Sequence, residues 1–279
     1  MKNLGYYNGK FGEAEEMSIP FNDRVSFFGD GVYDATYSRD YKIFCAEEHI
    51  DRLFNSARLL DIKIKETKEE MKFLLEEMVK KMDTGDNFVY FQVTRGVGKR
   101  NHTFDEDMTG NLWINIYPKS IVDLTKSVSA ITMEDTRFFH CNIKTLNLIP
   151  SVMASQKAKK EGCFETIFHR NGRVTECAHS NVHIIKDGVF KTAPLDNLIL
   201  PGTTRRHLIE LCNELGIPVE EKPFYLDELF DADEIIISSA GALCVRVKEL
   251  DKRKVGGKAE ELITKLQKVM LEHFYESTK

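Results

Sequence analysis

Residues 88–95 read Phe-Val-Tyr-Phe-Gln-Val-Thr-Arg, a run dominated by aromatic and β-branched residues. This composition predicts a largely buried strand, because such side chains pack well on the pleated surface of a sheet. A second run of the same kind, Asn-Leu-Trp-Ile-Asn-Ile-Tyr, follows at 111–117. The first part of the chain therefore contains at least two core strands.

The strand pattern is interrupted at Pro118-Lys119-Ser120 and resumes at Ser127. An interruption of this kind is typical of a linker between compact units. We predict a first domain over residues 1–120 and a second over 121–279.

Helices are expected on both sides of this boundary. After a predicted strand at 41–45, a helix begins near Glu47, and its apolar residues fall at the spacing of one helix face: Ile50, Leu53, Phe54 and Ala57. A second helix is predicted after Thr67, which with Glu70 forms a capping-box pattern. In the second half we predict strands at 164–168, 181–185, 189–192 and 234–238, and helices near 150–161, 204–215 and 258–274. Because these elements follow no regular βαβ rhythm, the pattern predicts an α+β fold.

The composition limits the classes of function. The chain has 279 residues, 42% of them hydrophobic and 30% charged, with a formal net charge of −5. These values are typical of a globular protein and argue against nucleic acid or an anionic membrane as a partner. The amino-terminal residues form no apolar run, and the six scattered cysteines show no metal-binding spacing, so we expect a cytoplasmic enzyme without a metal site.

Lys144 lies between apolar neighbours in Cys141-Asn-Ile-Lys-Thr-Leu-Asn, just before a predicted helix. Partial desolvation would lower the pKa of such a lysine and free its amine for Schiff-base chemistry. Judged by its spacing alone, the residue fits a surface lysine in a loop, because buried lysines are rare. A solvent-facing role is also open for Arg52, which lies about 200° round its helix from Ile50.

Other candidate residues lie at predicted helix and strand ends. In Leu200-Pro-Gly-Thr-Thr, either Thr203 or Thr204 could cap a helix whose free backbone N–H groups suit a phosphate group. Arg100 and His102 follow the strand at 88–95 and could hold a carboxylate. Taken alone, Asp30 and Glu176 are expected to be solvated turn carboxylates.

Five segments stand out in order along the chain: Phe28-Gly-Asp-Gly-Val-Tyr-Asp, Glu48-His-Ile-Asp-Arg-Leu, Asn142-Ile-Lys-Thr-Leu-Asn, Val174-Thr-Glu with Ser180-Asn-Val, and Ile199-Leu-Pro-Gly-Thr-Thr-Arg. Together they resemble the class IV, or fold type IV, pyridoxal-phosphate-dependent aminotransferases. Two further segments, Phe91-Gln-Val-Thr-Arg-Gly with Arg100-x-His102 and Glu134-Asp-x-Arg-Phe, are most similar to the branch of that family that acts on D-amino acids.

This resemblance implies a smaller N-terminal α/β domain, a larger C-terminal domain with a barrel-like sheet, pyridoxal 5′-phosphate held between them, and a homodimer. It implies that Lys144 forms the Schiff base and moves the substrate's Cα proton, and that Glu176 pairs with the pyridine nitrogen. The implied phosphate ligands are Arg52, Thr203 and Thr204. The remaining cofactor contacts are Leu200, His179, Ser239 and Ala240, and the substrate carboxylate would be bound by Tyr33, Arg100 and His102.

The expected reaction is transamination between a D-amino acid such as D-alanine and a 2-oxo acid such as 2-oxoglutarate or pyruvate. Two features depart from the pattern of the resemblance: His179 stands where a small hydroxyl residue is usual, and Ser238-Ser-Ala-Gly replaces a threonine near the phosphate. The alternatives on the same fold are an aminodeoxychorismate lyase and a branched-chain L-amino-acid aminotransferase. A binding module without a cofactor, built on a decayed enzyme fold, is the alternative from another class.

Overall fold

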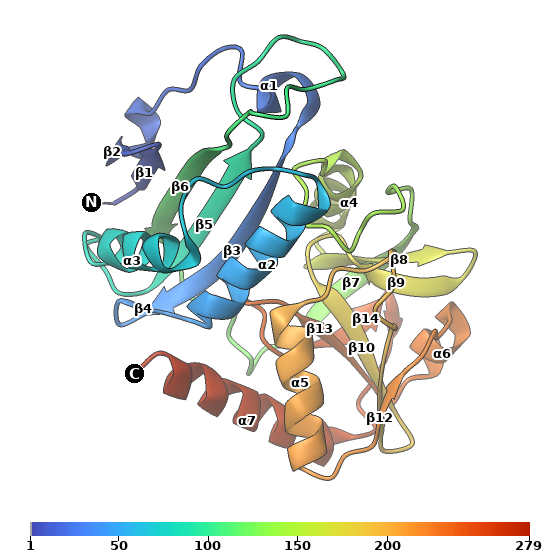
Figure 1. Cartoon of the computed structure of the whole chain (residues 1–279). Helices are drawn as coiled ribbons and strands as arrows, with labels where there is room; N and C mark the ends of the chain where they lie inside the picture. Colours follow the sequence, from blue (N-terminus) through green and yellow to red (C-terminus); the bar gives the residue numbers. More distant parts are fainter. Residues whose placement is uncertain (1) are drawn as a thin grey trace. The chain divides into compact units, whose positions relative to one another are not determined.

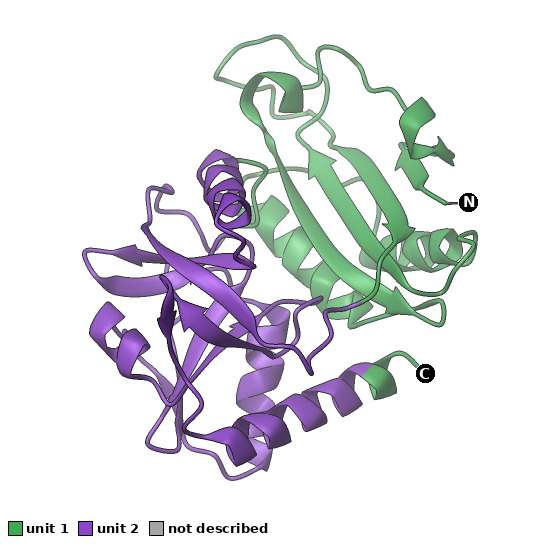
Figure 2. Ribbon diagram, turned by 180° about the vertical axis from the view of Figure 1, so that it is seen from behind, with its two compact units in different colours: residues 1–120, 143–147, 275–279 green, residues 121–142, 148–274 purple. Residues whose placement is uncertain are grey.

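The computed structural model describes residues 2–279 and divides into two compact units (Figure 2). Unit 1 consists of the chain up to Ser120 together with residues 143–147 and 275–279. Unit 2 consists of residues 121–142 and 148–274. Two short segments of unit 1, 143–147 and 275–279, fall within residues 121–279, the range predicted for the second domain.

Unit 1 is built on one antiparallel sheet with the strand order β2-β1-β6-β5-β3-β4 (Figure 1). Its strands are β1 (Leu4–Tyr7), β2 (Lys10–Glu13), β3 (Gly31–Arg39), β4 (Lys42–Ile43), β5 (Asn87–Thr94) and β6 (Asn111–Pro118). The predicted strands at 88–95 and 111–117 are confirmed as β5 and β6. The predicted strand at 41–45 is wrong in extent, because only Lys42–Ile43 pairs, antiparallel to the end of β3.

The helices of unit 1 are η1 (Ala14–Glu16), α1 (Val25–Phe28), α2 (Ala46–Leu59) and α3 (Lys68–Val79). Helix α2 packs on the sheet through the predicted face, with Ile50, Leu53 and Ala57 buried in the core. Helix α3 begins with the predicted capping box, in which the Thr67 hydroxyl accepts from the Glu70 N–H and the Glu70 carboxylate accepts from the Thr67 N–H. Local sequence thus fixes where both helices sit against the sheet.

Unit 2 contains a larger mixed sheet with the strand order β12-β11-β10-β13-β14-β7-β8-β9, and β15 pairs with β14. Its strands are β7 (Val128–Glu134), β8 (Glu165–Arg170), β9 (Arg173–Cys177), β10 (Asn181–Lys186), β11 (Val189–Thr192), β12 (Val219–Glu221), β13 (Glu234–Ser238), β14 (Val245–Leu250) and β15 (Arg253–Lys254). Strands β9 and β10 are far apart in this order, yet they contact each other. The sheet therefore curls on itself, as the barrel-like prediction required.

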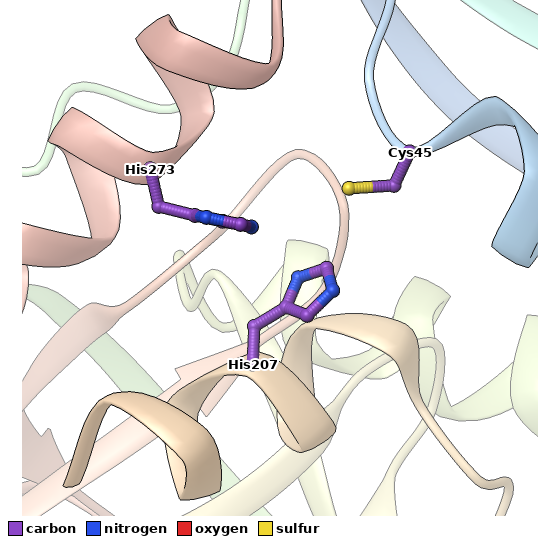
Figure 3. A group of neighbouring side chains, drawn as sticks. All are labelled: Cys45, His207 and His273. Atoms are coloured by element: carbon purple, nitrogen blue, oxygen red, sulfur yellow. The ribbon is translucent and has the colours of Figure 1, made fainter. Parts of the chain in front are cut away.

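The helices of unit 2 are α4 (Ile149–Lys160), α5 (Thr203–Glu214), α6 (Leu226–Asp231) and α7 (Glu260–Ser277). The predicted helices near 150–161, 204–215 and 258–274 are confirmed as α4, α5 and α7. His207 on α5 and His273 on α7 bring their rings edge to face, with centroids 4.6 Å apart (Figure 3). Among residues 2–279, no helix is both long and apolar enough to cross a membrane.

Candidate active site

Lys144 belongs to unit 1, where its backbone lies against the first residues of β3. The Tyr33 N–H donates to the Lys144 carbonyl at 2.9 Å, and the Lys144 N–H donates to the Ser56 hydroxyl at 3.2 Å. The ammonium Nζ lies 4.4 Å from the centre of the Tyr33 ring, which is the distance of a cation–π contact. The lysine is half-buried, so the structure fixes the peptide that carries the amine rather than leaving it in a solvated loop.

Arg52 is also placed in unit 1, and it does not project freely from a solvated helix face. Its guanidinium grips the fully buried carboxylate of Asp34, with Nε donating to Oδ2 and Nη2 donating to Oδ1, both at 2.8 Å. The side chain of Arg52 is 11% exposed. The interpretation of Arg52 as an unattached surface arginine is therefore wrong.

Arg100 and His102 both lie against Phe28, at the end of α1. The Arg100 guanidinium is 5.6 Å from the centre of the Phe28 ring, and the His102 ring is 5.4 Å from it. Arg24 approaches the same ring at 4.8 Å and donates to the Asn101 carbonyl at 2.7 Å. The two predicted carboxylate ligands are thus brought together, and a buried arginine that the sequence did not single out anchors their loop.

Asp30 was expected to be a solvated turn carboxylate, and this is wrong. Its carboxylate accepts from Arg24 Nε at 2.8 Å and from Arg95 Nε at 2.9 Å, and it is only 13% exposed. Asp30 therefore joins the end of β5 to the segment before β3 inside unit 1.

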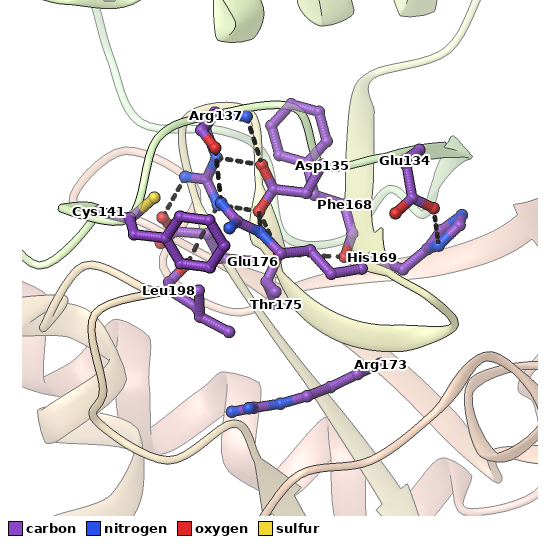
Figure 4. A network of polar contacts seen from close by, with 12 residues as sticks. Glu134, Asp135, Arg137, Cys141, Phe168, His169, Arg173, Thr175, Glu176 and Leu198 are labelled. Atoms are coloured by element: carbon purple, nitrogen blue, oxygen red, sulfur yellow. Dashed lines mark hydrogen bonds and ion pairs between the residues drawn. The ribbon is translucent and has the colours of Figure 1, made fainter.

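Glu176 lies in unit 2 on β9 and is buried, with 5% exposure, so the expectation of a solvated turn is wrong for this residue as well. Its Oε2 accepts from the Leu200 N–H and from Asn181 Nδ2, both at 3.0 Å. Its Oε1 accepts from Arg137 Nη1 (Figure 4). These donors favour an ionised carboxylate, because each of them offers a proton and none accepts one.

Arg137 is in turn held by Asp135 (Figure 4). Nε and Nη2 of Arg137 each donate to one oxygen of the Asp135 carboxylate at 2.9 Å. Burial by itself lowers the pKa of Arg137, but hydrogen bonds and charge from Asp135 and Glu176 raise it above its usual value. Arg137 is therefore a permanent cation beside Glu176, and Asp135 fixes its orientation.

The N-terminus of α5 carries the predicted phosphate-binding threonines. Gly202 is the N-cap and makes no side-chain cap, and the first turn contains no acidic residue. Thr203 and Thr204 are buried, and within residues 2–279 the buried Thr204 Oγ1 has no hydrogen-bond partner. An uncapped helix start with a buried, unsatisfied hydroxyl fits an anionic group such as a phosphate.

The last predicted residues of unit 2 lie in loops. Ser239 Oγ accepts from the Ala242 N–H at 3.1 Å, and Ala240 is half-buried beside it. The His179 imidazole is 60% exposed, and its Nδ1 contacts the buried carboxylate of Glu165. The departure at position 179 therefore introduces a contact to Glu165.

Several residues that touch the candidate site residues were not singled out from the sequence, among them Asp34, His49, Arg137 and Asn181. A signal was present for Arg137, because Asp135-x-Arg137 was part of the resemblance. Asp34 also ends a quoted segment of the resemblance, but its strand β3 was not predicted, so nothing in the sequence placed it against Arg52.

Comparison with known proteins agrees with this geometry. The family model "Amino-transferase class IV" matches residues 31–250. D-alanine aminotransferase of Listeria monocytogenes serotype 1/2a (strain 10403S) is 40% identical over 271 residues, covering 95% of this chain and 94% of that protein. D-alanine aminotransferase of Bacillus licheniformis is 38% identical and covers 93% of this chain and 92% of that protein.

Solved structures share the fold at lower identity. The branched-chain amino acid aminotransferase of Escherichia coli matches with a TM-score of 0.90 at 22% identity, covering 100% of this chain and 96% of the other. The T.th. branched-chain amino acid aminotransferase, solved in complex with N-(5'-phosphopyridoxyl)-L-glutamate, matches with a TM-score of 0.89 at 23% identity, covering 100% of this chain and 95% of the other.

The chain belongs to the class IV aminotransferases. The predicted fold class is confirmed, and so are the predicted enzyme class and its cofactor, pyridoxal 5′-phosphate. The buried unsatisfied hydroxyl of Thr204, the amine of Lys144 and the ionised carboxylate of Glu176 are groups that suit this cofactor's phosphate, aldehyde and pyridine nitrogen.

Proposed function

We propose that this chain transfers the amino group of a D-amino acid, such as D-alanine, to a 2-oxo acid such as 2-oxoglutarate or pyruvate, by ping-pong kinetics. The observation that carries the proposal is the similarity, over nine-tenths of the chain or more, to relatives that are D-alanine aminotransferases, 36–40% identical. The similarity to branched-chain enzymes at 22–23% identity supports the fold alone.

Lys144 is the residue to which we assign the covalent link to the cofactor and the transfer of the substrate proton. Bound pyridoxal 5′-phosphate supplies an electron-accepting ring that stabilises negative charge on the substrate's Cα. As a free amine, Nζ of Lys144 would accept and hold the substrate's Cα proton. The two backbone contacts of Lys144, to Tyr33 and Ser56, support this role because they fix the point from which the amine reaches.

Glu176 is the residue to which we assign the pairing with the pyridine nitrogen. An ionised carboxylate keeps a proton on that nitrogen, and the donors from Arg137, Asn181 and the Leu200 N–H favour the ionised form. Leu200 thus contributes through its backbone, which supports its place among the cofactor-binding residues.

We assign the cofactor's phosphate to Arg52, Thr203 and Thr204, and we assign further cofactor contacts to Ser239 and Ala240. The guanidinium suits a phosphate because its planar fork matches the oxygen geometry, and the start of α5 suits it because its N–H groups point outward. We assign His179 to the cofactor's surroundings through its contact with Glu165.

Tyr33, Arg100 and His102 are assigned to the substrate's α-carboxylate. Because Lys144 acts from one side only, the group that binds the carboxylate decides which enantiomer presents its Cα proton to the amine. The gathering of Arg100 and His102 around Phe28 supports a joint role in this selection.

We further propose a cytoplasmic homodimer. Three apolar side chains of α4 support an interface, because Ile149, Val152 and Met153 are 73%, 55% and 63% exposed. The six cysteines are present as thiols, the state that a reducing compartment maintains. Light scattering coupled to gel filtration measures the mass directly, and a monomer at micromolar concentration would contradict the dimer.

A half-reaction screen tests the proposed function. The holoenzyme is mixed with single D- or L-amino acids, and the absorbance of the bound cofactor is followed for conversion to the amine form. We expect D-alanine to convert it and L-leucine to leave it unchanged; the reverse would favour a branched-chain L-amino-acid aminotransferase. Release of D-glutamate from D-alanine and 2-oxoglutarate separates transamination from a lyase reaction. Lys144→Ala should reduce turnover by several orders of magnitude.

A further inference from the structure

Asp34 is a buried carboxylate to which the proposed chemistry gives no role. It lies on β3 with no exposed surface and accepts four hydrogen bonds, all at 2.8 Å. Two come from Arg52, one from Nδ1 of His49 and one from the N–H of Ala35. Burying an ionised carboxylate this completely costs free energy unless it is paired and hydrogen-bonded. The question is therefore what Asp34 does for the partners that it holds.

His49 and Arg52 reach Asp34 from the same face of α2, because residues three apart on a helix are neighbours. Asp34 accepts from Nε and Nη2 of the guanidinium. Since the guanidinium is planar and rigid, fixing two nitrogens fixes the direction of the third.

The charges of this cluster follow from its burial. Burial raises the pKa of Asp34, but the charges and hydrogen bonds of Arg52 and His49 lower it by more. The net pKa therefore lies well below the usual range. Burial lowers the pKa of His49, although Asp34 opposes this. A neutral imidazole whose Nδ1 faces a carboxylate carries its proton on that nitrogen, and His49 therefore donates to Asp34.

Asp34 also has an unfavourable effect on anion binding, because its negative charge balances the positive charge of Arg52. If charge alone decided the affinity for a phosphate, removing the charge of Asp34 would strengthen binding. If the orientation of Arg52 decides it, removing the charge would weaken binding. The two effects have opposite signs, so a single isosteric substitution separates them.

We propose that Asp34 and His49 are positioning residues that hold the guanidinium of Arg52 in the orientation that binds the cofactor's phosphate group. The inference rests on the proposed role of Arg52. His49 acts on Asp34 and Asp34 acts on Arg52, and of these three residues Arg52 is the one that contacts the phosphate. Orientation outweighs the charge lost to Asp34.

The test compares two cofactor forms that differ only in the phosphate. The full chain is freed of cofactor, and the dissociation constants of pyridoxal 5′-phosphate and of pyridoxal are measured by equilibrium dialysis. We expect Asp34→Asn to weaken pyridoxal 5′-phosphate binding about 10-fold, the size of a lost charge-assisted hydrogen bond, while pyridoxal binding changes less than about twofold. Tighter binding of pyridoxal 5′-phosphate, or an equal loss for both forms, would overturn the inference.

A pair of His49 variants tests whether the hydrogen bond from His49 to Asp34 contributes to the orientation of Arg52. Asn places an amide donor where Nδ1 stands, whereas Phe fills the space without a donor. We therefore expect His49→Asn to retain the preference for the phosphorylated form and His49→Phe to lose about threefold or more of it. Equal preferences in the two variants would remove His49 from the proposal.

Two further variants make the outcomes distinguishable. Asp23→Asn is the matched control, because Asp23 is a fully buried carboxylate of unit 1 that accepts from Thr94 Oγ1 and Asn111 Nδ2, and we expect its ratio of the two dissociation constants to match the wild type. Arg52→Gln tests the underlying assignment. If Arg52→Gln leaves the ratio unchanged, the proposed role of Arg52 fails; if it changes the ratio and Asp34→Asn does not, only the positioning inference fails.

Discussion

Arg52 in unit 1 and Arg137 in unit 2 are held in the same way. Each places Nε and Nη2 on the two oxygens of a buried aspartate, Asp34 in the first case and Asp135 in the second. They differ in the third corner of the guanidinium. Nη1 of Arg137 donates to Glu176, a residue of the same unit, whereas we assign the corresponding corner of Arg52 to the cofactor's phosphate.

This difference shows that one local device can serve two purposes. In unit 2 we assign to the arginine the support of a cofactor-binding carboxylate, and in unit 1 we assign the cofactor contact to the arginine itself. An aspartate that takes two corners of a guanidinium leaves one direction defined, and what lies in that direction decides the function. Substitutions in the two clusters should therefore change different measured quantities.

Among the substitutions that compare the two clusters, the largest effect is expected from Glu176→Gln. Gln removes the negative charge that keeps the pyridine nitrogen protonated, so kcat should fall roughly 10²–10³-fold, as when one preorganised electrostatic partner is removed. The preference for pyridoxal 5′-phosphate over pyridoxal should stay within about twofold, because the phosphate ligands are intact. Steady-state kinetics with D-alanine and the two dissociation constants measure both.

Glu234→Gln is the matched control for that substitution. Glu234 is a fully buried carboxylate of unit 2 that accepts from Arg246 Nε at 2.7 Å, and it has no assigned role in the reaction. We expect it to lower the free energy of unfolding while kcat stays near the wild-type value. A similar loss of kcat in both variants would mean that the effect of Glu176→Gln is structural.

A smaller fall in kcat is expected from Arg137→Gln. Glu176 would keep the donors from Asn181 and Leu200, so kcat should fall about 10-fold, the size of one charge-assisted hydrogen bond. The ratio of the two dissociation constants should not change, in contrast to Arg52→Gln. A changed ratio in Arg137→Gln would remove the distinction between the two clusters.

How far the sequence predicted these clusters depends on the distance along the chain. Asp135 and Arg137 are two residues apart, and a short motif can reveal them. Asp34 and Arg52 are 18 residues apart on different elements, and the packing of α2 against β3 brings them together. The helices were predicted well because their apolar spacing and capping box are local signals. The burial of Asp30 and Glu176 was not, because it depends on arginines supplied from elsewhere in the fold.

The next effect is expected at Gly202, before α5. A Cβ at this position would overlap Asn181 Oδ1, and the same Asn181 donates to Glu176 and to the Leu200 carbonyl. Gly202→Ala should therefore cost about 1–3 kcal/mol of the free energy of unfolding, as overpacking does, and should lower kcat as well. Urea unfolding and kinetics measure the two effects.

Gly12→Ala is the control for that overlap, because a Cβ there meets no atom within 4 Å. We expect its free energy of unfolding to stay within about 0.5 kcal/mol of the wild type. If Gly202→Ala also left the free energy of unfolding and kcat unchanged, Asn181 would be able to move away without destabilising the fold. Its hydrogen bond to Glu176 would then contribute little to the reaction.

The smallest effect concerns the buried histidines of the two units. His49 faces a carboxylate, whereas His183 contacts two hydroxyls, Thr192 Oγ1 at 2.9 Å and Ser238 Oγ at 2.7 Å. Burial, with a contribution from the charge of Arg205, lowers the pKa of His183 to about 3. Below about pH 6.5 the unfolded chain binds a proton at this residue that the folded chain does not, so stability should fall as the pH falls.

The loss should amount to about 1.4 kcal/mol between about pH 7.5 and about pH 5.5 for His183 alone. Urea unfolding of the wild type and of His183→Gln at both pH values isolates this term, because Gln cannot take up the proton. The stability difference between the two proteins should shrink by that amount at the lower pH. An unchanged difference would mean that the imidazole of His183 takes up a proton in the folded chain as readily as in the unfolded chain.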